Sequence, residues 1–218
     1  MTPVSKGVER LAVGKQAPTL VDSALKDFLT KNFTIVCGSM WPGDDEVLFR
    51  SLHSLDILPN LIWVPHELDF DHEKKVKGRL SSLGYKVVSF DLNIPLLSEG
   101  PLAIIVMKKG ILAELYRLGA AAYVGGAFGS GVHSVWEPAL CGIPVACGPR
   151  INRSPESKEL IKSGVLTRIC TDGELARWIE DCVVKKHGAQ LQSVVNSIVE
   201  KHKGAATRIV ALCESDKY

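Results

Sequence analysis

A glycine-rich stretch in the middle of the chain has the residue types that a phosphate-binding loop needs. It reads AAYVGGAFGSGVHSVWEPALCGIPVACGPR over residues 121–150, which predicts a strand, a glycine loop, a helix and a second strand. Gly126, Gly129 and Gly131 have no side chain, so the backbone can approach a ligand closely there. We expect the helix to begin near Ser134, a residue type that suits a helix cap. The unpaired N–H groups at such a helix end favour an anion such as phosphate.

Two side chains beside this loop are candidate ligand contacts. Glu137 falls in the first turn of the expected helix, where its carboxylate either accepts hydrogen bonds from ribose hydroxyls or only complements the helix dipole. His133 precedes the helix and is either a donor to a phosphate or carboxylate, or a cap or core residue. The glycine spacing differs from the GxGxxG pattern that opens the first βα unit of nicotinamide-binding domains, which disfavours that class.

Two other loops are expected at the same edge of the sheet. In VCGSMWPGDDEV, residues 36–47, Gly38 and Ser39 leave a strand, and the following acids are explained by helix capping and the helix dipole. Trp41 is a large aromatic residue in this loop and is suited to packing on a base or sugar. In VPHELDFDH, residues 64–72, His66 and Glu67 lie at the end of the next strand, a position that suits binding.

Alternating strands and helices must position these loops. Short runs of apolar and β-branched residues alternate with longer amphipathic stretches, which is typical of βα units in a parallel sheet. Because the strands are apolar on both faces, we predict an α/β fold with a Rossmann-like, doubly wound parallel sheet and ligands at the carboxyl ends of the strands. Strands are expected at residues 34–37, 61–64, 86–90, 102–106, 121–124, 144–147 and 166–169, and helices at 44–54, 71–83, 111–118, 134–140, 155–163, 172–185 and 190–213.

The chain is divided into three parts by these elements. Residues 1–32 are interpreted as a linker and a lead-in helix, residues 33–185 as the Rossmann-like domain, and residues 186–218 as a carboxyl-terminal helix. With 46% hydrophobic and 23% charged residues among 218, the chain is expected to fold as a globular protein. No apolar run approaches the roughly 20 residues of a membrane-spanning helix.

Charge and cysteine content exclude several other classes. A formal net charge of +2 gives no broad electrostatic reason to bind nucleic acid. The 6 cysteines are far apart, without CxxC pairs or histidines at metal-ligand spacing. We therefore expect no metal site and no cofactor, and we interpret the cysteines as reduced core residues.

The strings GSMWPGDDE, VPHELD and YVGGAFGSGVHSVWEPALCGIPVACGP resemble the carboxyl-terminal half of 3-deoxy-D-manno-octulosonic acid (Kdo) transferases. The resemblance extends over about residues 33–185. It implies a GT-B glycosyltransferase, in which two Rossmann-like domains face each other and the carboxyl-terminal one holds the donor, CMP-Kdo. It also implies that the lipid A precursor, the general base and the membrane anchor are bound or carried by an amino-terminal half outside this chain. The fragment would then be soluble and inactive by itself, and the full protein would lie at the cytoplasmic face of the bacterial inner membrane.

The resemblance also implies roles for individual residues. Gly38, Ser39 and Trp41 would line the nucleotide side, and Pro65, His66 and Glu67 would lie close to the cytidine. The loop that contains Gly126, Gly129 and Gly131 would face the phosphate and the sugar acid together with His133 and Ser134. Glu137 would bind the ribose, and Gly110 begins a GILAELY segment that aligns with the family.

The sequence departs from the family pattern at Lys108, Lys109, Val132 and Ser134. These departures leave two alternatives open. One is half of another GT-B glycosyltransferase that uses a UDP-sugar, because Rossmann-like halves bind many donors. The other is a nucleotide-sugar-binding or scaffold module without catalysis.

Overall fold

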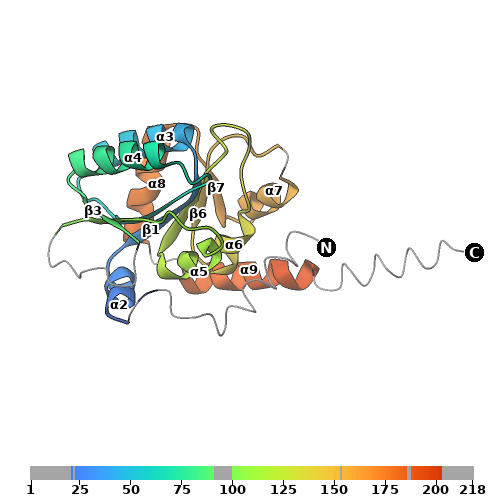
Figure 1. The fold of residues 1–218 in the computed structure, drawn as a ribbon. Coiled ribbons are helices and arrows are strands. Elements are labelled where there is room, and N and C mark those ends of the chain that lie inside the picture. Colours follow the sequence, from blue (N-terminus) through green and yellow to red (C-terminus); the bar gives the residue numbers. More distant parts are fainter. Residues whose placement is uncertain (1–20, 22, 91–99, 153, 186–187, 203–218) are drawn as a thin grey trace, which may run out of the picture.

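A seven-stranded sheet forms the centre of the protein (Figure 1). This computed structural model describes residues 21, 23–90, 100–152, 154–185 and 188–202. Each neighbouring pair of strands is parallel, and the order across the sheet is β3-β4-β2-β1-β5-β6-β7. The strands are β1 Thr34–Met40, β2 Asn60–Pro65, β3 Lys86–Ser89, β4 Leu102–Ile105, β5 Ala121–Val124, β6 Val145–Cys147 and β7 Leu166–Arg168. The parallel sheet predicted from the sequence is confirmed, and each predicted strand is present.

Helices cover both faces of this sheet, as a doubly wound fold requires. Successive strand residues point to opposite faces, so Ile35 and Cys37 of β1 belong to one core cluster and Val36 belongs to another. The first cluster packs under α3 Pro42–His53, α4 Phe70–Ser82 and α8 Asp172–Val184. The opposite face is covered by α2 Ser23–Lys31, α5 Leu112–Leu115, the 3₁₀ helix η2 Tyr116–Leu118, α6 Trp136–Leu140, α7 Pro155–Lys162 and α9 Gly188–His202.

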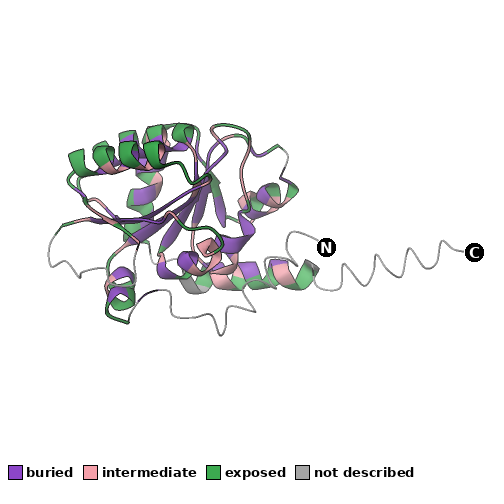
Figure 2. Cartoon of the chain, in the orientation of Figure 1, coloured by how far each residue is buried: buried purple, intermediate pink, exposed green. Residues whose placement is uncertain are grey.

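Burial follows this layered arrangement. Figure 2 shows buried residues along the strands and exposed residues on the outer faces of the helices. Side-chain caps begin three of the helices, with Asp69 capping α4, Ser154 capping α7 and Thr171 capping α8. Cys37, Cys147 and Cys182 are buried, as predicted for core cysteines, whereas Cys170 is exposed, so the core interpretation is wrong for that residue.

Two predicted segments extend beyond what the structure describes. The carboxyl-terminal helix was expected at residues 190–213, and α9 covers Gly188–His202, so the rest of that prediction lies outside the described residues. The linker at the start of the chain also lies outside them, whereas its lead-in helix is α2, which buries Leu25 and Leu29 against the sheet. The three-part division of the chain stays a prediction.

The order of the strands creates a switch point beside β1. From β1 the chain proceeds to β2, β3 and β4 on one side, and then crosses to β5, β6 and β7 on the other side. The loops after β1 and β5 therefore lead away from each other at the carboxyl edge of two adjacent strands. Open parallel sheets bind their ligands in the crevice at such a point. No helix in the described part of the chain is long and apolar enough to cross a membrane.

Candidate functional site

Three aromatic rings from three different loops meet at the switch point. Trp41 follows β1, His66 follows β2 and His133 lies between β5 and α6. The ring centroids of Trp41 and His66 are 4.6 Å apart, and those of His66 and His133 are 4.2 Å apart. The indole Nε1–H of Trp41 donates a hydrogen bond to Nε2 of His133 at 3.0 Å. The structure thus brings together three residues that the sequence placed in the site.

His133 is half-buried within this cluster. Burial, and secondarily the neighbouring His66, lowers the pKa of His133 below its ordinary value of 6.5. The ring is therefore held neutral at physiological pH. A neutral His133 is a hydrogen-bond donor rather than the cation that would neutralise a phosphate.

Asp44 joins the first loop to the glycine loop. Its side chain is 0% exposed and accepts hydrogen bonds from the Gly126 backbone N–H at 2.8 Å and the Tyr123 hydroxyl at 3.1 Å. Burial raises the pKa of Asp44, while its hydrogen bonds act in the opposite direction. The interpretation that helix capping and the helix dipole fully explain this acid was wrong, because its buried carboxylate accepts hydrogen bonds from β5 and the loop after it.

Asp45 makes a second buried connection, between the start of α3 and its neighbours. It is 2% exposed and accepts from the indole Nε1–H of Trp63 on β2 at 2.7 Å. Its other oxygen lies 2.5 Å from Nε2 of His72 on α4. Asp45 was also explained by helix capping and the helix dipole, and its buried partners correct that interpretation.

The glycine loop folds into a compact turn that depends on missing side chains. The Gly126 carbonyl accepts from the backbone N–H groups of Gly129 at 2.9 Å and Gly131 at 3.0 Å. Gly126 has a φ of 97°, and a Cβ placed there would collide with the Gly131 carbonyl and lie 2.8 Å from Cδ2 of His133. Only glycine permits this close approach.

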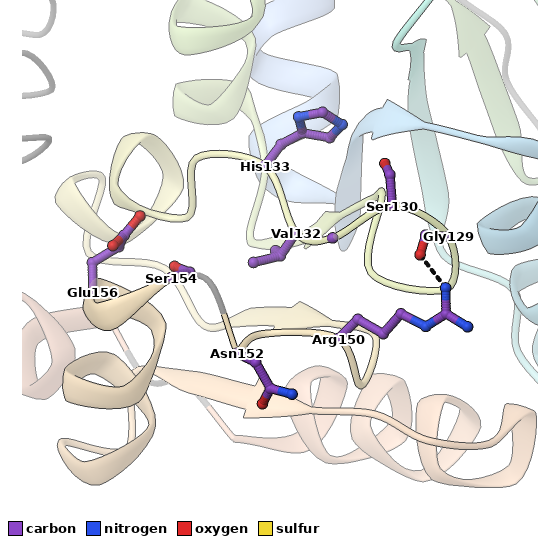
Figure 3. Close-up of a pocket in the computed structure, with 9 residues that line it drawn as sticks. Gly129, Ser130, Val132, His133, Arg150, Asn152, Ser154 and Glu156 are labelled. Carbon is purple, nitrogen blue, oxygen red and sulfur yellow. Dashed lines mark hydrogen bonds between the residues drawn. The ribbon is translucent and has the colours of Figure 1, made fainter.

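An open cavity of about 570 Å³ lies beside the glycine loop (Figure 3). Its lining comes from the glycine loop, the segment after β6 and the start of α7, and comprises Gly129, Ser130, Gly131, Val132, His133, Arg150, Asn152, Ser154 and Glu156. The Arg150 guanidinium donates to the Gly129 carbonyl. Arg150 was not among the predicted site residues, although its place three residues after the predicted 144–147 strand puts it near the carboxyl edge.

The helix after the glycine loop differs from the prediction. It begins at Trp136 rather than near Ser134, and it has 5 residues. The intervening segment is tied elsewhere, because the Val132 N–H donates to the Arg150 carbonyl and the His133 N–H donates to the Gly125 carbonyl. Ser134 is exposed and does not cap the helix, whose cap position is taken by Val135 without a side-chain bond.

Glu137 does lie in the first turn of α6, as predicted, and is 9% exposed. Its two proposed roles, toward ribose or toward the helix dipole, therefore stay predictions.

The remaining candidates are spread along the same edge. Gly38 and Ser39 were expected to leave the strand, but they lie inside β1, where the Ser39 φ of 54° accompanies an irregular register with β2. Gly38 packs against the side chain of Tyr116. Pro65 is the buried last residue of β2 and pairs in the sheet register with Met40, the last residue of β1.

Glu67 and Gly110 are exposed, Glu67 after β2 and Gly110 in the loop after β4, where its φ is 87°. Their binding roles stay predictions. Within the described ranges, no group of three or more His, Cys, Asp or Glu side chains is arranged to hold a metal ion.

Comparisons with known proteins give this geometry a context. No protein-family model matches the chain. The chain is 32% identical over 167 residues to a 3-deoxy-D-manno-octulosonic acid transferase of Aquifex aeolicus, covering 74% of this chain and 45% of that protein. It is 30% identical over 131 residues to the transferase of that name from Chlamydophila psittaci, covering 59% of this chain and 29% of that protein. The chain is homologous to part of the Kdo transferases. It spans less than half the length of these curated relatives.

Solved structures show the fold. The carboxyl-terminal CMP-Kdo binding domain of WaaA from Acinetobacter baumannii matches with a TM-score of 0.61 at 16% identity, over 90% of this chain and 97% of that domain. Anabaena HepE in complex with UDP and glucose matches with a TM-score of 0.60 at 18% identity, over 90% of this chain and 54% of that protein. The chain thus has the Rossmann-like fold of one half of a GT-B glycosyltransferase.

Proposed function

We propose that this chain is the donor-binding domain of a Kdo transferase and binds CMP-Kdo at the switch point. The observation that carries the proposal is the convergence of Trp41, His66 and His133 beside the glycine loop and the Arg150 cavity. Rings, glycine backbone and a cation are the groups that a nucleotide needs. The homology to Kdo transferases supports CMP-Kdo as the particular nucleotide sugar.

The phosphate and the sugar acid are assigned to the cavity. Arg150 is the cation among its lining residues, and Gly129 and Gly131 let the backbone of the glycine loop come close to a ligand at its rim. His133 contributes a neutral donor because its pKa is lowered by burial. The cytidine is assigned to the side of Trp41 and His66, and the ribose to Glu137.

The reaction assigned to the complete enzyme is an inverting transfer. A carboxylate of the other domain takes a proton from the acceptor hydroxyl, and the oxygen attacks the anomeric carbon of Kdo while the bond to CMP breaks. This domain stabilises the charge that develops on the leaving phosphate. The isolated chain is therefore inactive. The acceptor is a lipid A precursor, and the complete enzyme works at the cytoplasmic face of the inner membrane.

Nucleotide titrations by calorimetry test the proposal on the 218-residue chain. CMP should bind, and UMP should bind more weakly, because the two differ at the base edge that the site must read. Equal or tighter binding of UMP or UDP would favour the UDP-sugar alternative. Binding of CMP by the chain, without transfer after the second domain is supplied, would favour a non-catalytic module.

A further inference from the structure

Trp41 and His133 lie side by side rather than face to face. Their ring planes differ by 5°, their centroids are 6.4 Å apart, and the 3.0 Å hydrogen bond joins an edge of each ring. His66 stacks on both, with interplanar angles of 22° and 17°. The indole and imidazole thus form one flat pair, and His66 covers a face of that pair.

This pairing fixes the position of a proton. An indole Nε1–H can only donate, so Nε2 of His133 must be the acceptor and carries no hydrogen. A neutral imidazole with an unprotonated Nε2 carries its hydrogen on Nδ1. Among the described residues, Nδ1 has no hydrogen-bond partner. Its N–H is therefore available to a ligand on the side of the ring away from Trp41.

The same contact opposes protonation of His133. A proton on Nε2 of His133 would face the Nε1–H of Trp41, and two donors cannot bond to each other. Protonation would therefore break the hydrogen bond between the two rings. His66 on the β2 loop is the titratable group in contact with the ring, while Arg150 after β6 and Glu156 on α7 line the cavity that His133 also borders. Burial and the neighbouring His66 disfavour the cation further.

We infer that Trp41 is a positioning residue that holds His133 as a neutral Nδ1–H donor for an oxygen acceptor of the bound nucleotide sugar. The identity of that ligand rests on the proposed function. The state of His133 does not, because it follows from contacts in the unliganded protein. Trp41 therefore acts through His133, in addition to any contact that its own ring makes with the ligand.

The first test measures the His133 ring by ¹⁵N NMR without ligand. The parent should show an unprotonated Nε2, a hydrogen on Nδ1 and a scalar coupling across the hydrogen bond to Trp41 Nε1. Trp41→Phe keeps an aromatic ring but removes the donor, so the Nε2–H tautomer should appear and the pKa of His133 should rise. Trp178→Phe is the matched control, since Trp178 is a half-buried indole on α8. This variant should change neither the tautomer nor the pKa of His133.

The parent spectrum alone decides the inference if Trp41→Phe fails to fold. An Nε2–H tautomer in the folded parent would overturn it. So would an unchanged tautomer and pKa in a folded Trp41→Phe variant.

The second test is a double-mutant cycle with CMP as the probe. Trp41→Phe and His133→Ala should each weaken CMP binding by about fivefold to tenfold, the range of one lost hydrogen bond. Because Trp41 acts in part through this ring, the loss in the double variant should be clearly smaller than the sum of the two single losses. Fully additive losses would contradict the positioning role. If the parent shows the Nδ1–H tautomer but binds no CMP, the proposed function fails and the role of Trp41 in setting the tautomer is supported.

Discussion

The carboxylate of Asp44 accepts a hydrogen bond from the backbone N–H of Gly126, 82 residues further along the chain, at 2.8 Å. Asp44 lies in the first turn of α3, and Gly126 lies in the turn after β5. The contact fixes the two loops that separate at the switch point. A ligand that enters there meets a glycine loop whose shape is already set, which lowers the entropy cost of binding.

Asp44→Ala should destabilise the protein by about 2–4 kcal/mol, because it leaves the buried Gly126 N–H and the Tyr123 hydroxyl without an acceptor. Asp71→Ala is a suitable control. Asp71 is an exposed acid in the first turn of α4, so its loss should cost about 0.3–1 kcal/mol. Urea unfolding of both variants gives the comparison. Equal small losses would show that Asp44 only complements the helix dipole.

The fold could be predicted because its signals are local. Most strands are short apolar runs that alternate with longer amphipathic stretches, so the parallel, doubly wound sheet followed from this alternation and from strands that are apolar on both faces. The start of α6 was predicted too early because Ser134 has the residue type of a helix cap. In the structure, Val132 and His133 donate their backbone N–H groups to Arg150 and Gly125 instead of joining the helix. Local propensity cannot report such contacts.

The site was predictable in part for a similar reason. Trp41, His66 and His133 each follow a predicted strand, and parallel strands present such residues at one edge. Their stacking and hydrogen bond depend on strand order, which local sequence patterns do not specify. Asp44 and Asp45 were misjudged because an acid at a helix start looks the same in sequence whether it is exposed or buried.

Gly126→Ala should lower both stability and CMP binding by more than backbone strain alone would. Gly126 and Gly164 both have positive φ, 97° and 76°, so alanine costs about 1–2 kcal/mol of backbone strain at either position. At Gly164 a Cβ meets nothing within 4 Å, whereas at Gly126 it meets the Gly131 carbonyl and the His133 ring. Gly126→Ala should therefore be less stable than Gly164→Ala and should lose CMP binding, as measured by melting and titration. Matching behaviour of the two variants would argue against the tight turn.

Arg150→Gln should weaken CMP binding by about tenfold or more, because it removes a charge-assisted hydrogen bond to the phosphate. Arg150 is exposed, so the free energy of unfolding should change by less than about 0.5 kcal/mol. Lys158→Gln removes an exposed charge from α7 outside the cavity lining and is the control. If the two variants bind CMP equally well, the phosphate does not lie against Arg150.

His72 should make stability depend on pH. Its hydrogen bond to Asp45 raises the pKa of His72 above the ordinary value of 6.5 in the folded protein. Folding therefore gains from a protonated His72: the gain is complete below pH 6.5 and is lost as the pH rises through the folded pKa. His72→Gln keeps a donor but does not titrate, so the difference in unfolding free energy from the parent should shrink above pH 6.5. His53→Gln, at an exposed histidine of α3, is the control. A constant difference for His72→Gln would contradict the ion pair.

The most direct measurement is a map of backbone amide chemical shifts during titration with CMP. A second cavity of about 550 Å³ lies at the amino edge of the sheet, lined in part by Asn32 and Asn60, and gives an internal comparison. We expect saturable shifts at the carboxyl edge, including Trp41, His66, Gly129 and Arg150, with Asn32 and Asn60 unchanged. Shifts confined to the amino edge, or no shifts at millimolar CMP, would contradict nucleotide binding at the switch point.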